Sequence, residues 1–130
     1  MATTETAADA GAITGVVQLY IDGARTGDAG KLQEAFDGRA SMFGSLGGER
    51  VDIPISQMIE MVKAQPMGET YEARITSVEH AGDAATVTVE ETGCWGSVSF
   101  TDYFLLSRID GDWKIVGKAF AHTGGEMPTG

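Results

Sequence analysis

Hydrophobic residues near the N-terminus recur at intervals of three and four positions, as they do on one face of a helix. This spacing predicts a first helix between Asp9, which suits the N-cap position, and Gly27, which suits the position after the last turn. The side chains on its apolar face are Ile13, Val16, Val17, Tyr20, Ile21 and Ala24.

Two shorter helices are predicted before Pro66. Asp28 can cap the first and Ser56 the second, because short polar side chains accept hydrogen bonds from the free N–H groups at a helix start. The second helix, Ser56–Gln65, ends before Pro66, since the residue preceding a proline avoids the helical conformation. The apolar positions are Leu32, Ala35 and Phe36 in the first helix, and Met58, Ile59, Met61 and Val62 in the second.

Four segments after Pro66 alternate between apolar and polar residues, which is typical of strands that bury one face. Asp110 and Gly111 form a strong hairpin signal between the last two, and the turn-forming run 81–84 precedes the second. The segment 39–53 is predicted to hold two short strands around 44–48. The four alternating segments are 71–76, 86–91, 98–107 and 113–120.

Helices that precede antiparallel strands are typical of an α+β fold. We expect a strongly curved, mostly antiparallel sheet with the three N-terminal helices over its concave face. Together they would form a cone-shaped barrel that encloses a cavity. The length of 130 residues suits a single domain over residues 1–130. The polar segments 1–9 and 124–130 are expected to be flexible tails.

The composition excludes several classes of partner. Nineteen acidic and nine basic side chains give a net charge of −10, so a nucleic acid or an anionic membrane surface would be repelled. No apolar run approaches the ~20 residues that a membrane-spanning helix needs, and the N-terminus does not have the pattern of a signal peptide. We therefore expect a cytoplasmic protein.

The sequence also carries no signature of a cofactor. Cys94 is the only cysteine, which excludes an internal disulfide and a multi-cysteine metal cage. The two histidines lie far apart, and no glycine-rich pattern of a nucleotide site occurs. We expect neither a metal nor a cofactor.

Asp102 departs from the pattern of its strand. Because side chains alternate between the faces of a sheet, Asp102 should share a face with Phe100 and Phe104. A carboxylate in that setting loses hydration, which disfavours its charged form and marks a candidate site residue. Two other interpretations stay open. A β-bulge could turn Asp102 outward, or its side chain could be a structural acceptor for backbone N–H groups or an arginine.

Tyr20 and His122 are the other candidate catalytic residues. A buried tyrosine needs a hydrogen-bond partner, and Tyr20 with a protonated Asp102 could bind a carbonyl oxygen or an oxyanion. Tyr20 could equally be a core residue bonded to a backbone carbonyl. His122 could act as a general base near the cavity, or it could bond to solvent or a neighbour at the strand end.

Several large apolar side chains are candidates for the cavity wall. Residues of these types belong to the core more often than to a ligand site, but some of them must line the cavity if it exists. They are Phe36, Met42, Met58, Trp95, Phe100, Phe104 and Phe120.

Four stretches of the chain resemble the nuclear transport factor 2-like superfamily. They are VVQLYIDGARTGD, KLQEAF, RASMFG and FTDYFLLSRIDGDWKIVGKAFAH, and they lie within about Ala12 to His122. Within the superfamily the chain is most similar to the putative lumazine-binding, SnoaL-like branch. The resemblance implies a cone-shaped domain that usually forms a homodimer through the outer face of its sheet. It does not specify the ligand, because this fold hosts isomerases, dehydratases, cyclases and binding modules.

The chain is also similar to the ketosteroid isomerases. Tyr20 matches their oxyanion-hole tyrosine, and Asp102, in TDYF, matches their protonated aspartic acid. The position of their catalytic base corresponds to Gly44, which carries no carboxylate. The resemblance therefore supports a carbonyl-binding pair and not that enzyme's reaction.

Three hypotheses about function follow. The chain could be a pocket protein that binds a small apolar or aromatic ligand with a carbonyl group. It could be an enzyme of isomerisation, dehydration or cyclisation that moves a proton with Asp102 or His122 while Tyr20 donates to the oxyanion. It could also be a non-catalytic dimerisation or interaction module with a vestigial cavity.

Overall fold

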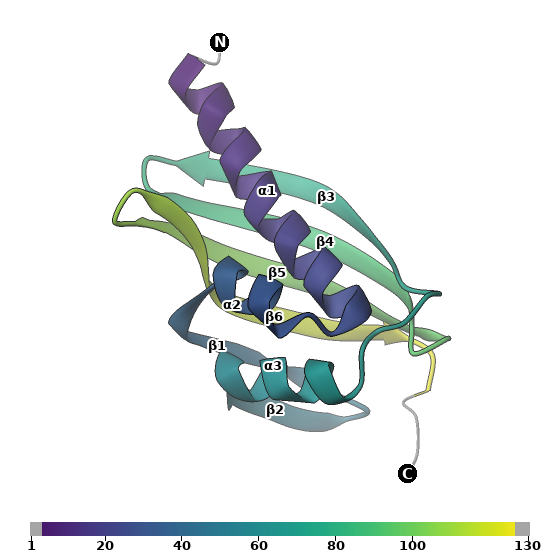
Figure 1. Cartoon of the computed structure of the whole chain (residues 1–130). Coiled ribbons are helices and arrows are strands. Elements are labelled where there is room, and N and C mark those ends of the chain that lie inside the picture. The colour runs from purple at the N-terminus through teal and green to yellow at the C-terminus, as the bar shows by residue number, and fades with distance from the viewer. Residues whose placement is uncertain (1–3, 127–130) are drawn as a thin grey trace.

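The computed structural model of the protein describes residues 4–126 and contains three helices and six strands within that range. All three helices lie on one face of the sheet (Figure 1). This arrangement confirms the predicted α+β fold with helices over one side of a curved, mostly antiparallel sheet. In chain order the elements are α1 (Thr4–Thr26), α2 (Ala29–Ala35), β1 (Phe36–Leu46), β2 (Glu49–Pro54), α3 (Ile55–Ala64), β3 (Glu72–Ala81), β4 (Ala84–Cys94), β5 (Val98–Ile109) and β6 (Asp112–Gly124).

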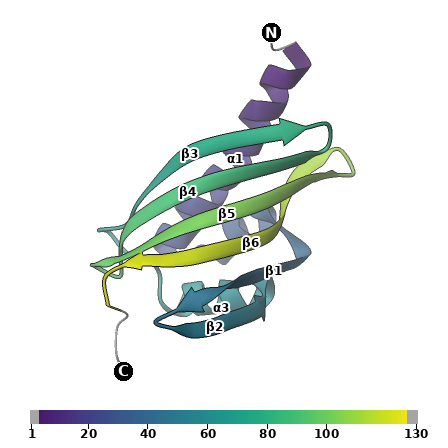
Figure 2. The same cartoon turned by 180° about the vertical axis from the view of Figure 1, so that it is seen from behind.

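The six strands form one sheet in the order β2-β1-β6-β5-β4-β3. Every neighbouring pair is antiparallel except β1 and β6, which run parallel. The helix α1 crosses over the half of the sheet formed by β3, β4 and β5, and α3 lies over β1 and β2 (Figure 1). Figure 2 shows the opposite, outer face of the sheet, which no helix covers.

The turns agree with the residues that predicted them. Asp110 and Gly111 both have positive φ angles, 51° and 87°, which a tight hairpin between β5 and β6 requires. Gly27 follows the last residue of α1 with a φ of 74°, and its N–H donates to the carbonyl of Gly23. Asp28 caps α2, accepting from the backbone N–H of Lys31 at 3.2 Å.

Two helix starts differ from the prediction. The helix α1 begins at Thr4, so Asp9 lies inside it, and the Asp9 carboxylate binds Arg108 of β5 at 2.6 Å instead of capping the helix. Pro54, and not Ser56, is the N-cap of α3. Of the predicted tails, residues 4–9 are helical and Gly124 ends β6, while residues 1–3 and 127–130 lie outside the described part of the chain.

The core lies between the helices and the sheet. The apolar face of α1 is buried there, and Ile13, Val17 and Tyr20 have no exposed surface. None of the helices between residues 4 and 126 is long and apolar enough to cross a membrane.

Candidate functional site

A cavity of about 170 Å³ lies among α3 and the strands β1, β4, β5 and β6. Most of its wall is apolar, but three ionisable side chains, Glu91, Asp102 and Lys118, also line it. Met61 belongs to the wall and is 50% exposed, so the cavity reaches the surface beside α3. The remaining lining residues are Met42, Leu46, Met58, Val62, Gln65, Met67, Trp95, Phe100 and Phe120.

Because side chains alternate between the two faces of a strand, Glu91 of β4 and Asp102 of β5 both point to the inner face of the sheet. Asp102 pairs with Val89 of β4 and with Phe120 of β6, in register and with no bulge at that position. The bulge that could have turned Asp102 outward is therefore absent, and its side chain is 1% exposed. Glu91 follows Val87 and Val89 at alternate positions of β4, so it faces the same side, and it is also 1% exposed.

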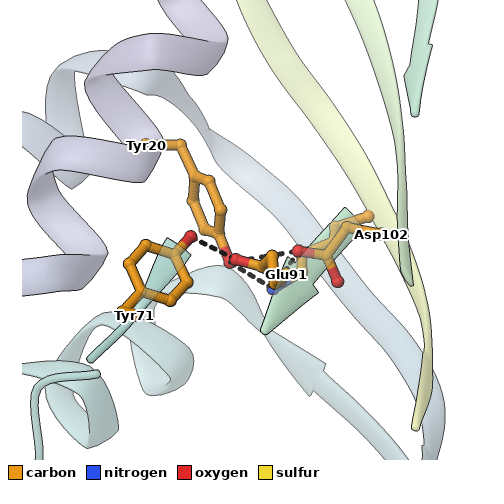
Figure 3. A network of polar contacts seen from close by, with 5 residues as sticks. Tyr20, Tyr71, Glu91 and Asp102 are labelled. Atoms are coloured by element: carbon orange, nitrogen blue, oxygen red, sulfur yellow. Dashed lines mark hydrogen bonds and ion pairs between the residues drawn. The ribbon is translucent and has the colours of Figure 1, made fainter. Parts of the chain in front are cut away.

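Tyr20, Tyr71, Glu91, Asp102 and Lys118 form one network, which we call the polar cluster (Figure 3). The Tyr20 hydroxyl lies 3.2 Å from Asp102 Oδ2 and 3.3 Å from Glu91 Oε2, and it accepts a hydrogen bond from Lys118 Nζ at 2.9 Å. The Tyr71 hydroxyl donates to Glu91 Oε2. Lys118 Nζ also forms an ion pair with Asp102 Oδ2 at 3.6 Å. Residues from α1, β4, β5 and β6, together with Tyr71 just before β3, thus converge on one point.

The two tyrosines are held in place by aromatic and cationic neighbours. The Tyr20 ring packs edge-on against Phe36 and Phe104, with centroids 5.9 and 4.9 Å away. Arg25, five residues after Tyr20 in α1, donates to the backbone carbonyl of Tyr71, and its guanidinium carbon lies 5.2 Å from the centre of the Tyr71 ring. These contacts orient both phenol groups toward the polar cluster.

The charges of the polar cluster do not balance if both carboxyl groups are ionised, because Lys118 is its one cation. Burial, followed by the nearby charge of Asp102, raises the pKa of Glu91 well above its usual value. The raised pKa favours the protonated, neutral form of Glu91, and the ion pair within the cluster joins Lys118 to Asp102. Burial likewise raises the pKa of Tyr20 and of Tyr71, so both phenols keep their protons.

One oxygen of each buried carboxyl group has no hydrogen-bond partner within the described residues. These atoms are Glu91 Oε1 and Asp102 Oδ1, and both residues line the cavity. Leaving a buried polar atom without a partner costs about 1–3 kcal/mol. A polar group of a ligand could satisfy either atom.

The structure brings Tyr20 and Asp102 together but leaves His122 apart from them. The His122 ring is half-buried at the end of β6, where Nδ1 accepts from the N–H of Gly47 at 3.4 Å. Its Nε2 lies 2.7 Å from the carbonyl oxygen of Gly125. His122 does not line the cavity, because strand β6 carries it two positions beyond Phe120 and the loops there occupy both ring nitrogens.

Five of the seven predicted wall residues line the cavity, namely Met42, Met58, Trp95, Phe100 and Phe120. Phe36 and Phe104 do not, because their rings pack against Tyr20. Trp95 has a φ of 52°, uncommon for an aromatic residue, and its indole N–H donates to the carbonyl of Gln65 at 3.1 Å. That bond ties the β4–β5 turn to the end of α3 beside the cavity.

Sequence reasoning missed Glu91, Tyr71 and Lys118 as members of the site. The sequence does contain a signal for Glu91, because it follows Val87 and Val89 at alternate positions, in the same way that Asp102 follows Phe100. Lys118 lies on the inner face because a register shift at Leu105–Leu106 changes the parity of β6, and the sequence gives no signal of that shift. Tyr71 precedes its strand and depends on Arg25 for its position.

Other chemistry receives no support from the geometry. Burial raises the pKa of Cys94 to about 12, so its thiol is a poor nucleophile. Residues 4–126 contain no group of three or more side chains placed to hold a metal ion. A side chain at Gly44 would have its Cβ 2.6 Å from the Phe120 ring, so that ring fills the space of the isomerase base.

The sequence profile of the family described as "Putative lumazine-binding" matches residues 8–121. The chain belongs to this family. Among solved structures, the chain is similar to a nuclear transport factor 2-like protein of unknown function from Silicibacter pomeroyi DSS-3. The two are 31% identical with a TM-score of 0.81, and the match covers 95% of this chain and 100% of that one. A protein of the same description from Shewanella baltica OS155 is 23% identical with a TM-score of 0.82, over 98% of this chain and 100% of that one. The superfamily and the putative lumazine-binding branch expected from the sequence are both confirmed.

A curated relative carries an enzyme name. The chain is 24% identical to "Aldolase FrzH" of a Cladobotryum species over 115 residues, which cover 88% of this chain and 92% of the relative. A ketosteroid isomerase-like protein from Erwinia carotovora atroseptica SCRI1043 shares 15% identity with a TM-score of 0.70, over 90% of this chain and 98% of that one. That second likeness shows the fold alone. The family and the fold together support a ligand-binding pocket.

Proposed function

We propose that the protein binds a small, mainly apolar or aromatic ligand through a carbonyl group directed at the polar cluster. The observation that carries this proposal is the placement of Glu91, Asp102 and Lys118 in an otherwise apolar wall. The protonated form of Glu91, which its raised pKa favours, and the Lys118 side chain are hydrogen-bond donors suited to a carbonyl oxygen. The apolar wall suits the rest of the ligand.

The volume of the cavity limits the size of the ligand. A cavity of roughly 150 Å³ lined by apolar side chains accommodates benzene, and this cavity measures about 170 Å³. A compound with one aromatic ring therefore fits without rearrangement. Four methionines in the wall, Met42, Met58, Met61 and Met67, allow it to adapt to other shapes.

A second candidate function is proton transfer on the bound carbonyl compound. The polar cluster holds two carboxyl groups: the raised pKa of Glu91 favours its protonated form, and Asp102 forms the ion pair with Lys118. Such a pair can remove one proton while donating another. An aldol reaction begins with the removal of a proton beside a carbonyl, and the relative named an aldolase favours this class of chemistry. Isomerisation, dehydration and cyclisation would use the same step.

One experiment with acetophenone tests both functions. Binding should raise the melting temperature, since a ligand that binds only the native state stabilises it, and ethylbenzene, which lacks the carbonyl, should have a smaller effect. In D₂O, proton transfer should remove the methyl signal of acetophenone from the NMR spectrum faster than buffer does. Binding without exchange supports a pocket protein, and the absence of both contradicts the proposal.

Matched variants assign each effect to its residues. Met58→Trp should fill the cavity and abolish binding, while Gln57→Trp, on the exposed side of α3, should not. Asp102→Asn should stop the exchange, and Asp112→Asn, an exposed residue of β6, should leave it unchanged. Circular dichroism confirms that each variant is folded. Equal effects of Met58→Trp and Gln57→Trp would place the binding site elsewhere.

We also propose that two copies associate through the outer face of the sheet, as the family resemblance implies. Phe43, Tyr103 and Leu105 are 46%, 53% and 55% exposed there, and Ala119 pairs with both Phe43 and Tyr103. These four residues form the outer patch. A cytoplasmic location stays a prediction.

A further inference from the structure

The amine of Lys118 is buried beside the cavity and surrounded by aromatic rings. Its side chain is 6% exposed and lines the cavity. The rings of Tyr20, Phe104 and Phe120 lie within 4.8 to 6.0 Å of Nζ. A lysine enclosed by apolar rings and open to a cavity is placed as enzymes place the lysines that react with carbonyl compounds.

We propose that Lys118 forms an imine with an aldehyde or ketone held in the cavity. This inference rests on the proposed binding function and specifies it, because the ligand must then carry a reactive carbonyl and not an amide or ester. The bond forms between Nζ and the carbonyl carbon, and the carbonyl oxygen leaves as water.

The polar cluster holds the groups that this reaction needs. Asp102, 3.6 Å from Nζ, takes a proton from the ammonium, and the free amine then attacks the carbonyl carbon. Glu91 protonates the carbonyl oxygen and recovers a proton from the nitrogen, which yields a carbinolamine. The proton held by Asp102 then leaves with the hydroxyl group as water. The product is a protonated imine, and both carboxyl groups return to their initial states.

The fixed position of Nζ supports selectivity for this lysine. The Tyr20 hydroxyl accepts from Nζ at 2.9 Å and is itself held by two aromatic rings. Lys114, on the same strand, instead donates to the backbone carbonyl of Glu34 at 2.6 Å and does not line the cavity. It provides a matched control for Lys118.

Reductive trapping tests the proposal. The full chain is incubated with benzaldehyde and sodium cyanoborohydride, which reduces an imine to a stable benzylamine, and the modified lysines are mapped by mass spectrometry. We expect benzylation of Lys118 at least 10-fold faster than that of Lys31, Lys63 or Lys114. Lys118→Arg should remove this product, while Lys114→Arg should leave it unchanged.

Benzamide separates this proposal from the binding function, because it has a similar shape but forms no imine. Benzamide should compete with benzaldehyde and slow the labelling of Lys118. Shifts of NMR signals from cavity residues with benzamide, combined with uniform or absent labelling by benzaldehyde, would overturn the imine and leave the binding function standing. If neither compound perturbs the cavity, both proposals fail for aromatic carbonyl ligands.

Discussion

At the scale of single residues, two carboxyl groups share one buried cation. Transfer of an ionised carboxylate to a protein interior costs several kcal/mol, and Lys118 can compensate only one such charge. The raised pKa of the other group, Glu91, favours the form that keeps its proton, so this group ionises less readily in the folded state. This imbalance makes the protein sensitive to pH.

The raised pKa of Glu91 predicts that stability falls as the pH rises. The folded state binds the proton more tightly than the unfolded chain, so the stability that Glu91 contributes is complete below the usual pKa of 4.5. It is lost progressively as the pH rises from 4.5 through the raised pKa of the folded state. Within that window, the free energy of unfolding falls by up to ~1.4 kcal/mol per pH unit. Glu91→Gln, which cannot ionise, should therefore gain stability relative to the native protein between pH 5 and pH 8, as measured by urea denaturation.

Glu90→Gln is the matched control, because Glu90 is the neighbouring residue on the exposed face and pairs with Arg74 in solvent. Its difference from the native protein should stay within about 0.5 kcal/mol at every pH. A difference between Glu91→Gln and the native protein that does not change with pH would mean that Glu91 is ionised when folded.

The site was partly predictable at this scale. The alternation of β5 placed Asp102 inside, and the helical period of α1 placed Tyr20 opposite it, because both patterns depend only on local geometry. The partners that determine the charge of the cluster come from β4 and β6. Their approach depends on strand register, which local sequence does not specify.

At the scale of elements, the parallel pairing of β1 with β6 forms one wall of the cavity. Met42 of β1 pairs with Lys118, and Gly44 pairs with Phe120. The ring and the backbone oxygen of Phe120 both lie 2.6 Å from where a Cβ of Gly44 would be. Only glycine lets the two strands and the Phe120 ring approach this closely.

Gly44→Ala should therefore destabilise the protein by about 1–3 kcal/mol, the usual cost of overpacking. Displacement of Phe120 should also weaken the binding of acetophenone. Gly38→Ala in the same strand is the control, since a Cβ at Gly38 meets nothing within 4 Å. Chemical denaturation of both variants measures the difference, and equal stabilities would show that β1 can shift without cost.

The elements themselves were more predictable than their ends. The turn at Asp110 and Gly111 is predictable because it requires positive φ angles, which aspartate and glycine adopt more readily than other residues. The start of α1 was placed too late because Asp9 is a good N-cap by type, whereas Arg108, 99 positions away, binds its carboxylate. The ion pair with Arg108 overrides the local preference of Asp9 for the N-cap position. No pattern in the neighbouring sequence reveals a contact between residues so far apart.

At the scale of the whole molecule, the two faces of the sheet differ in what covers them. The helices cover the inner face and leave the outer face open (Figure 2). The outer patch of Phe43, Tyr103, Leu105 and Ala119 lies on that outer face, because its residues alternate along their strands with the buried Met42, Asp102 and Lys118. The net charge of −10 makes two copies repel each other, so their association needs apolar contact. In the proposed homodimer, the uncharged outer patch across β1, β6 and β5 would provide that contact.

A homodimer formed through the outer patch should have twice the mass of one chain in light scattering, and salt should strengthen it by screening the repulsion between copies. Leu105→Glu should shift the protein to monomer, because it places a charge in a contact that must bury about 800 Å² on each partner to be stable. Thr76→Glu, which adds the same charge at an exposed position of β3, should leave the dimer intact. A monomer at all protein and salt concentrations, or equal behaviour of the two variants, would contradict association through this face.

Because the cavity lies on the other side of the sheet, Leu105→Glu should still bind acetophenone, so loss of the dimer and loss of the ligand can be measured independently.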